Sequence, residues 1–381
     1  DCLKYDFGMK RKGRDDLLAL WVGDMDFRLP HEILDEFHKR IDHGIFGYTD
    51  PLDEYFAAMN HWFSTRYGYT IEPDWVTLGA GIVYALGTSV RAFTEEGDAM
   101  MVMQPVYYPF REVIEDNGRI FVNNQLHYED GKYTIDFEDF EKKIVDNNVK
   151  VFILCNPHNP VGRVWTKEEL EKMGDICLKH NVVIMDDEIH CDFTYPGFKF
   201  TSFMTLDEKY HNSLVLYTSP SKTFNVAGLQ PANIIIKNPE LRAAYRKANA
   251  AAGYSQGSIM GQVAVKSVYT KGDEWVNELV EYITGNMNYM RDFVKENFPK
   301  AHFVDPEGTY LTWVDFSGYG FTDEELEHIM VEEAHLWLDS GKVFGPATAQ
   351  FERFNLACPR ATVVKAMEQL KAALDNHTKW A

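Results

Sequence analysis

The sequence is poor in cysteine, has no long apolar run and carries fewer basic than acidic residues, and each shortage excludes a class of protein. Its five cysteines, Cys2, Cys155, Cys177, Cys191 and Cys358, are scattered and include no Cys-x-x-Cys pair. This spacing argues against a disulfide framework and gives no zinc or redox motif, so we expect no metal site. No stretch approaches the roughly 20 apolar residues that a membrane-spanning helix needs.

The excess of acidic over basic residues limits the partners that the protein can bind. Lysine and arginine total 38 against 58 aspartate and glutamate, a formal net charge of -20 at pH 7. Because nucleic acid and anionic membranes repel such a protein, we expect neither as a partner. With 45% hydrophobic residues, we expect a globular protein with reduced thiols in the cytoplasm. A chain of 381 residues is long enough for one large domain and a smaller one.

One lysine stands at a position suited to covalent chemistry. The apolar run Leu214 to Tyr217 is too short for a surface helix, and it ends at Ser219-Pro-Ser-Lys222. Hydroxyls and free amides at a strand end can bind an anion such as phosphate. A lysine there can form an imine with an aldehyde if its pKa is lowered. The alternative is an ordinary surface lysine in a loop.

Several polar or aromatic residues directly follow apolar strands. They are Tyr107, Asn159, Asp187 and Lys222. With helices between several of the strands, this pattern predicts a parallel α/β sheet that binds its ligand at the carboxyl ends of the strands. The register at Asp187 stays open, because Asp186 and Glu188 are adjacent and a helix cap or ion pair is an alternative. The predicted strands are 99–103, 151–155, 182–185 and 214–217.

The pattern changes near residue 275. A long helix is predicted through Asn297, followed by strands at 310–315 and 351–358, a capping box at Thr322 and Glu325, and a last helix over 361–374. We therefore predict an N-terminal arm with part of the small domain (1–43), a large domain (44–275) and a smaller α+β C-terminal domain (276–381). Arg353 in the last strand is a candidate clamp for a carboxylate, its alternative being a surface salt bridge.

The motifs in chain order resemble a known superfamily. Tyr107, Asn159-Pro-Val-Gly162, Asp187-Glu-Ile-His190, Ser221-Lys222 and Arg353-Phe-Asn-Leu-Ala357 resemble the fold type I pyridoxal phosphate enzymes of the aspartate aminotransferase superfamily. The resemblance covers nearly the whole chain. It is closest to the bacterial cystathionine β-lyase and cysteine C-S lyase group that includes MalY, PatB and cystalysin, through the segments 46–49, 106–109, 221–228 and 307–313.

The resemblance implies pyridoxal 5'-phosphate as the cofactor and a mostly parallel sheet of the seven-stranded type between helices. It implies that Lys222 binds the cofactor covalently, that Asp187 pairs with the pyridine nitrogen, and that Asn159 bonds the phenolic oxygen. Lys222, Asp187 and Tyr107 would be catalytic, with Tyr107 stacked on the ring and His190 also near the cofactor.

The resemblance also assigns the two ends of the site. The phosphate would be held by Gly81, Ile82, Val83, Ser219 and Ser221, joined by Tyr48 from the other subunit of a homodimer with shared active sites. The substrate, an amino acid, would bind to Arg353, in a pocket lined by Gly23, Asp24 and Tyr108. The alternative role of Tyr48 is packing within its own loop.

Two positions favour a lyase over an aminotransferase. His190 stands where aminotransferases of this superfamily usually have tyrosine, and Gln230 where they usually place an arginine on the phosphate. We therefore predict a lyase that cleaves cystathionine, cysteine or related S-substituted cysteines to a thiol, pyruvate and ammonia. The alternatives are an aminotransferase and a MalY-like regulatory protein that binds a transcription factor. Residues 346–350 replace the glycine-rich turn that similar lyases carry, which leaves the preferred substrate open.

Overall fold

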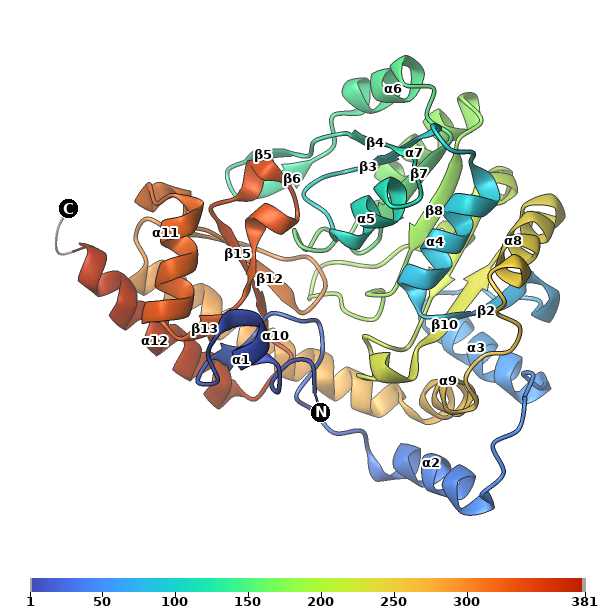
Figure 1. The fold of residues 1–381 in the computed structure, drawn as a ribbon, viewed down its shortest axis with the longest axis horizontal. Helices are drawn as coiled ribbons and strands as arrows, with labels where there is room; N and C mark the ends of the chain where they lie inside the picture. Colours follow the sequence, from blue (N-terminus) through green and yellow to red (C-terminus); the bar gives the residue numbers. More distant parts are fainter. Residues whose placement is uncertain (1, 379–381) are drawn as a thin grey trace.

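The computed structural model describes residues 2–378, and its main sheet matches the predicted class. This sheet consists of β2 (Val76–Ala80), β3 (Ala99–Val102), β4 (Ile120–Asn123), β7 (Val151–Cys155), β8 (Val183–Asp187), β9 (Leu214–Thr218) and β10 (Pro231–Ile235). The spatial order is β2-β10-β9-β8-β7-β3-β4 (Figure 1). Every neighbouring pair is parallel except the two that contain β10. The predicted mostly parallel α/β sheet is therefore confirmed.

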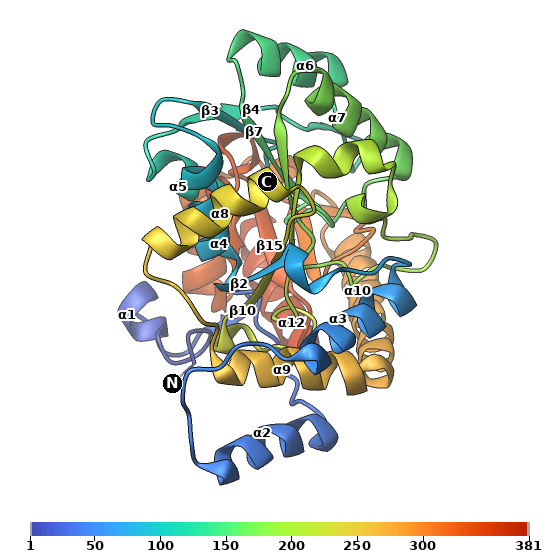
Figure 2. The same cartoon turned by 90° about the vertical axis from the view of Figure 1, so that its right-hand side faces the viewer.

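Helices cover both faces of this sheet (Figures 1 and 2). One face packs against α4 (Ile82–Phe93), α5 (Pro109–Glu115) and α8 (Pro239–Ala251). The other face packs against α3 (Asp53–Arg66), α6 (Phe137–Asp146), α7 (Lys167–Lys179) and α9 (Ile259–Lys271), and α2 (His31–His43) packs on α9. Residues of one strand alternate between the two cores: Ile153 lies in the first, and Phe152 and Leu154 lie in the second. Because both faces are covered, the central strands are apolar throughout.

The site-forming edge follows from the strand directions. Strands β3, β7, β8 and β9 run in parallel, and β2 has the same direction because β10 runs opposite to both β2 and β9. With β4, which is parallel to β3, the carboxyl ends of six strands thus meet at one edge, the position at which open α/β sheets bind ligands.

A second, antiparallel sheet follows in the C-terminal part. It has the order β11-β12-β15-β14, with β11 (His302–Val304), β12 (Leu311–Asp315), β14 (Asp339–Ser340) and β15 (Phe351–Asn355). It packs with α10 (Asp273–Asn297), α11 (Asp323–His328) and α12 (Arg360–Thr378) around a separate core. The predicted capping box of Thr322 and Glu325 is present, but α11 ends early and continues as a π-helical turn at Ile329–Glu333.

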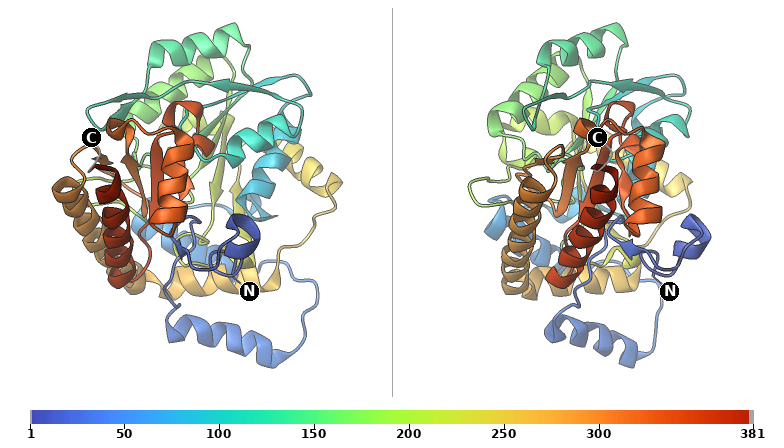
Figure 3. Two further views of the ribbon diagram at one scale, coloured as in Figure 1. Left: turned by 60° about the vertical axis from the view of Figure 1, so that its left-hand side comes forward. Right: turned by 90° about the vertical axis from the view of Figure 1, so that its left-hand side faces the viewer.

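The N-terminal segment joins this C-terminal part. After α1 (Gly8–Lys12), the short β1 (Leu18–Ala19) pairs in parallel with β13 (Leu336–Trp337). Trp21 stacks on Trp337 with ring centroids 4.5 Å apart. Figure 3 shows this N-terminal segment beside the C-terminal helices. The domain boundaries near residues 44 and 276 remain a prediction.

Two smaller features complete the description. A hairpin of β5 (His127–Glu129) and β6 (Lys132–Thr134) lies outside the main sheet. Within residues 2–378, no helix has both the length and the apolar character that crossing a membrane requires.

Candidate active site

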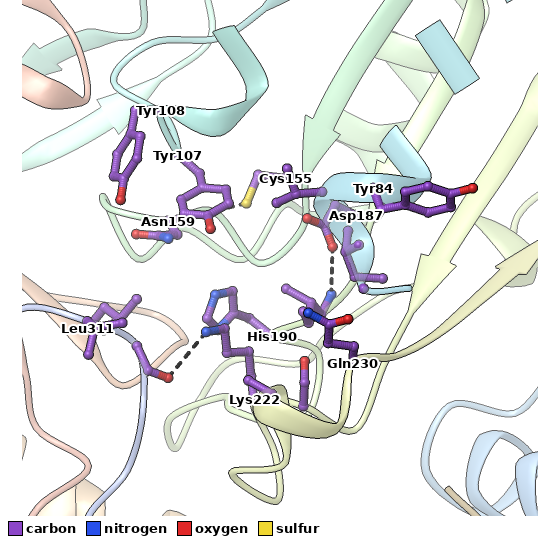
Figure 4. A pocket seen from close by; sticks show the side chains of 18 of the residues that line it. Tyr84, Tyr107, Tyr108, Cys155, Asn159, Asp187, His190, Lys222, Gln230 and Leu311 are labelled. Atoms are coloured by element: carbon purple, nitrogen blue, oxygen red, sulfur yellow. Dashed lines mark hydrogen bonds between the residues drawn. The ribbon is translucent and has the colours of Figure 1, made fainter. Parts of the chain in front are cut away.

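A cavity of about 290 Å³ lies at the carboxyl edge of the main sheet, where it meets the N-terminal segment and β15 (Figure 4). It brings together most of the residues that the sequence predicted for the site. Those that line it are Gly23, Gly81, Ile82, Val83, Tyr107, Tyr108, Asn159, Asp187, His190, Ser221, Lys222 and Arg353.

Three predicted site residues do not line the cavity. Tyr48 lies on the loop before α3 and is 97% exposed. Ser219 is buried in the turn before Lys222, where its hydroxyl donates to the Pro231 carbonyl at 2.6 Å and accepts from the Ser221 amide at 3.1 Å. Asp24 is outside the cavity lining, and its carbonyl accepts a hydrogen bond from Asn355 Nδ2 at 2.7 Å.

Lys222 extends into the cavity toward the N-terminal segment. Its Nζ donates to the Gly23 carbonyl at 3.3 Å, and a Cβ on Gly23 would stand 3.0 Å from that nitrogen. A larger residue at this position would therefore crowd the Lys222 amine and require it to shift. Burial lowers the pKa of Lys222, while the negative charges of Asp24 and Asp187 act in the opposite direction. The amine is therefore more readily neutral, and so more nucleophilic, than that of a surface lysine.

Asp187 is the last residue of β8, and its side chain faces the cavity. Its Oδ1 accepts a hydrogen bond from the Ile189 amide at 3.2 Å. Burial raises the pKa of Asp187 to about 7, although the charge of Lys222 opposes this shift. Since strand residues alternate between faces, Asp186 and Glu188 point to the opposite side of the sheet. The structure therefore places Asp187, and not Asp186, in the cavity.

Arg353 is buried on β15 with several polar partners. Its Nη1 donates to Asn159 Oδ1 at 3.1 Å, and its Nη2 donates to the Trp21 carbonyl at 2.7 Å. Nη2 also forms an ion pair with Asp339. Its Nε is buried and has no partner among the described residues. This donor has unused hydrogen-bonding capacity.

Two neutral groups occupy positions that the sequence singled out. His190 is buried against Tyr310, with ring centroids 5.8 Å apart. Burial lowers the pKa of His190 to about 3, and the charges of Lys222 and Arg353 act in the same direction. The imidazole is therefore uncharged at neutral pH. Gln230 lines the cavity with a left-handed backbone of φ 53°.

The start of α4 forms an anion-binding end of the cavity. Gly81 precedes the helix with φ +86°, a conformation that favours glycine. The first amides of α4, from Ile82 and Val83, have no helical acceptor and carry the positive end of the helix dipole. Ser221 lies in the same cavity. The first turn of this helix contains no acidic residue that would repel an anion.

The donor set fits pyridoxal phosphate. A helix start suits its phosphate, a buried carboxylate suits its ring nitrogen, and an amine with a lowered pKa suits its aldehyde. Figure 4 shows Tyr107 and Asn159 on one side of the cavity and Lys222 and His190 on the other, which leaves space for a flat ring. Within residues 2–378, no group of histidine, cysteine and acidic side chains is arranged to hold a metal ion.

Other lining residues were not assigned to the site from the sequence. Most are apolar or aromatic and form the walls: Trp21, Val22, Ala80, Tyr84, Cys155, Ile189, Ala227, Pro231 and Leu311. The exception is the charged Asp339. The only signal for Asp339 is an acidic residue that directly follows the apolar run 336–338.

The fold and this set of side chains define a pyridoxal phosphate-dependent enzyme, and comparisons with known proteins agree. Residues 15–370 match the family model of aminotransferase class I and II. The chain is 41% identical to cystathionine beta-lyase PatB of Bacillus subtilis, over 98% of this chain and 96% of that protein. It is 32% identical to protein MalY of Escherichia coli, over 98% and 95%.

A solved structure supports the same grouping. Cystalysin from Treponema denticola, whose crystal structure contains a pyridoxal 5'-phosphate cofactor, is 37% identical with a TM-score of 0.96, over 98% of this chain and 96% of that chain. The protein therefore belongs to the pyridoxal phosphate-dependent carbon-sulfur lyase group of the aminotransferase class I and II family.

Proposed function

We propose that this protein is a β-lyase that cleaves cystathionine, cysteine or related S-substituted cysteines to a thiol, pyruvate and ammonia. The observation that carries this proposal is the Lys222 amine, with its lowered pKa, in one cavity with Asp187 and Arg353. The name of the Bacillus subtilis relative, a cystathionine beta-lyase, supports the same activity.

The roles of the binding residues follow from the contacts. Arg353, through its unpartnered Nε, would bind the substrate carboxylate, because a guanidinium is suited to paired hydrogen bonds with that group. The amides at the start of α4 and Ser221 would hold the cofactor phosphate. Asp187 would keep the ring nitrogen protonated, and Asn159 and Tyr107 would lie against the ring.

The proton steps fall to this chain's own side chains. Bound pyridoxal phosphate supplies an electron-withdrawing ring attached to the substrate's amino group. Lys222, once free, would remove the proton from Cα, because it is the basic amine in the cavity. The thiolate would leave Cβ, and Lys222, on rebinding the cofactor, would displace the three-carbon enamine, which water hydrolyses to pyruvate and ammonia. Burial raises the pKa of Tyr107, so its phenol stays protonated in the cavity.

Cystathionine is expected to give pyruvate faster than any keto acid formed by transamination, by about tenfold or more, which requires only ~1.4 kcal/mol between the two barriers. The reason is that neutral His190 and Gln230 replace the tyrosine and arginine usual in aminotransferases. The measurement compares pyruvate and ammonia release with conversion of the cofactor to its amine form. Alanine, which has no leaving group on Cβ, is the control. Amine-form cofactor without pyruvate would identify an aminotransferase instead.

We also propose that the active unit is a symmetric dimer in which each site receives Tyr48 from the other chain. Tyr48 lies in an exposed apolar segment with Ile45, Phe46 and Leu52. Contiguous exposed apolar side chains are typical of interaction surfaces. An isologous interface can bring such a loop to the partner's cavity. Because Gln230 gives the phosphate no charged donor, the hydroxyl of Tyr48 would supply it with a further hydrogen bond.

Mixing two inactive variants tests this sharing. Tyr48→Ala and Lys222→Ala should each be weak alone, but a mixed dimer contains one site with both residues intact. Random pairing makes about half of the dimers mixed, so co-refolded protein should recover about a quarter of wild-type activity. Size-exclusion chromatography confirms that dimers have formed. A mixture no more active than the single variants would return Tyr48 to a packing role.

A further inference from the structure

Asp339 is a buried acid whose position in the cavity is not explained by the roles given above. It lies on β14 directly opposite Arg353 on β15, and its side chain is only 13% exposed. One oxygen, Oδ2, forms the ion pair with Arg353. The other, Oδ1, has no hydrogen-bond partner among the described residues. An acceptor with free capacity therefore lines the cavity beside the arginine.

This acid competes with the group that Arg353 is proposed to bind. When a substrate carboxylate reaches Arg353, one guanidinium faces two carboxylates in a buried space. A buried negative charge without a partner is costly, because water no longer solvates it. The other charged groups of the cavity are Lys222 and Asp187, which the proposed function assigns to the cofactor. Lys12, the nearby cation outside the cavity, is already paired with Glu327.

A second positive charge on the substrate would restore the balance. A second hollow of about 410 Å³ shares Tyr107 and Tyr108 with the cavity, and the charged Arg111, Asp323 and Lys342 also line it. Figure 4 shows Tyr108 next to Tyr107, on the side away from Asp187. The acid of the cavity that has no other role is Asp339, so we expect the second positive charge to lie beside it.

We propose that Asp339 is a specificity-determining residue that selects substrates whose sulfur substituent bears an ammonium group. This inference rests on the proposed function and names its substrate class. Oδ1 would accept a charge-assisted hydrogen bond from that ammonium while Oδ2 keeps its contact with Arg353. Cystathionine, which carries a distal amino group, belongs to this class, whereas cysteine and simple alkyl thioethers do not.

A matched pair of substrates tests the assignment. S-(2-aminoethyl)cysteine and S-propylcysteine have the same length and differ in an ammonium against a methyl group. With the wild-type holoenzyme, kcat/KM for pyruvate formation should favour the aminoethyl compound by about tenfold or more, the value of one charge-assisted hydrogen bond. Asp339→Asn should reduce this ratio to near one. Any effect on the shared carboxylate site cancels in the ratio.

A control variant separates local contact from a general field. Glu112→Gln removes a negative charge that acts on Tyr108, at an exposed residue outside the cavity lining, so it should keep the wild-type ratio. Equal kcat/KM values for the two substrates in the wild type would overturn the proposal. So would a ratio that survives Asp339→Asn, because the preference for the ammonium would then come from another group. An equal loss in Glu112→Gln would likewise overturn it.

A binding measurement keeps this inference separate from the proposed lyase activity. L-lysine and L-2-aminoheptanoate repeat the same ammonium-against-methyl comparison without a leaving group, and their binding changes the visible absorbance of the holoenzyme. Wild-type protein should bind lysine about tenfold more tightly or better. This binding measurement uses wild-type protein, so it also applies if Asp339→Asn does not fold. Tighter lysine binding without pyruvate from any thioether would contradict the lyase proposal and support the role of Asp339. Equal binding of the two amino acids would contradict only the role of Asp339.

Discussion

Replacing Lys222 with alanine is expected to lower kcat/KM for pyruvate formation by about 10⁴-fold or more, since the variant loses both a covalent anchor and the base nearest Cα. The variant should still bind pyridoxal phosphate, because the start of α4, Ser221 and Asp187 are unchanged. Borohydride reduction followed by peptide mass spectrometry provides the second readout. Wild-type protein should carry the pyridoxyl label on the peptide containing Lys222, and the variant should carry none.

A surface lysine supplies the matched control. Lys237 is partly exposed and pairs with Glu208 at 3.1 Å, away from the cavity lining. Lys237→Ala should therefore keep its activity within about twofold, as expected for a surface substitution. Labelling of any lysine other than Lys222 in the wild type would contradict the assignment.

The second large effect is expected for Asp187. Asp187→Ala should lower kcat/KM by about 10³-fold, similar to the loss of a preorganised electrostatic group in other active sites. Without this carboxylate the ring nitrogen loses its proton partner, so the ring withdraws electrons poorly. Cofactor affinity should also fall, because the variant lacks the carboxylate that pairs with the protonated ring nitrogen. Burial raises the pKa of Asp187 to about 7, so this pairing stabilises the charged form of its carboxylate. Single-turnover absorbance separates weak binding from slow proton removal.

The neighbouring Asp186 is the natural comparison. It is equally buried, and both of its carboxylate oxygens lack hydrogen-bond partners among the described residues. Burial raises the pKa of Asp186, and the nearby Glu188 acts in the same direction, so its carboxyl group is favoured in the neutral form. Asp186→Ala should therefore retain activity within about tenfold, because its side chain lies on the opposite face of β8. Near-normal turnover by Asp187→Ala together with an inactive Asp186→Ala would reverse the assignment.

The central strands could be predicted because burial on both faces leaves a continuous apolar run. The predicted strand 151–155 matches β7, Val151–Cys155, without a shift. The start of α4 is also encoded locally, since a glycine turn directly precedes Ile82–Phe93. The capping box of Thr166 and Glu169 marks the start of α7 in the same local way.

Other elements gave weaker local signals. Strand β4, Ile120–Asn123, is a short edge strand with partly exposed residues, so it lacks the apolar run of its neighbours. Helix α9, Ile259–Lys271, is buried on more than one side and contains Gly261 and several β-branched residues. It therefore shows no single apolar stripe. Both elements depend on tertiary packing.

In the candidate site, too, some residues could be predicted from the sequence and others could not. Asn159, Asp187 and Lys222 each follow a strand, so the topology alone places them at one edge. The choice between Asp186 and Asp187 required knowing which face of β8 the cavity occupies. Asp339 reaches Arg353 only through the pairing of β14 with β15, and no spacing in the sequence reveals that register. In the proposed dimer, the contacts of the exposed Tyr48 would come from a second chain.

The pairing of β1 with β13 also means that one wall of the site forms late during synthesis. Leu18 and Ala19 are translated before the main sheet, whereas their strand partners, Leu336 and Trp337, are translated after it. The cavity wall at residues 21–23 therefore has no adjoining strand to hold it while the ribosome is still adding the intervening chain. Pairings of such long sequence separation form late because they close a very large loop. A nascent chain whose seven-stranded sheet has formed still has an open cofactor site, because both β13 and Arg353 of β15 are added later.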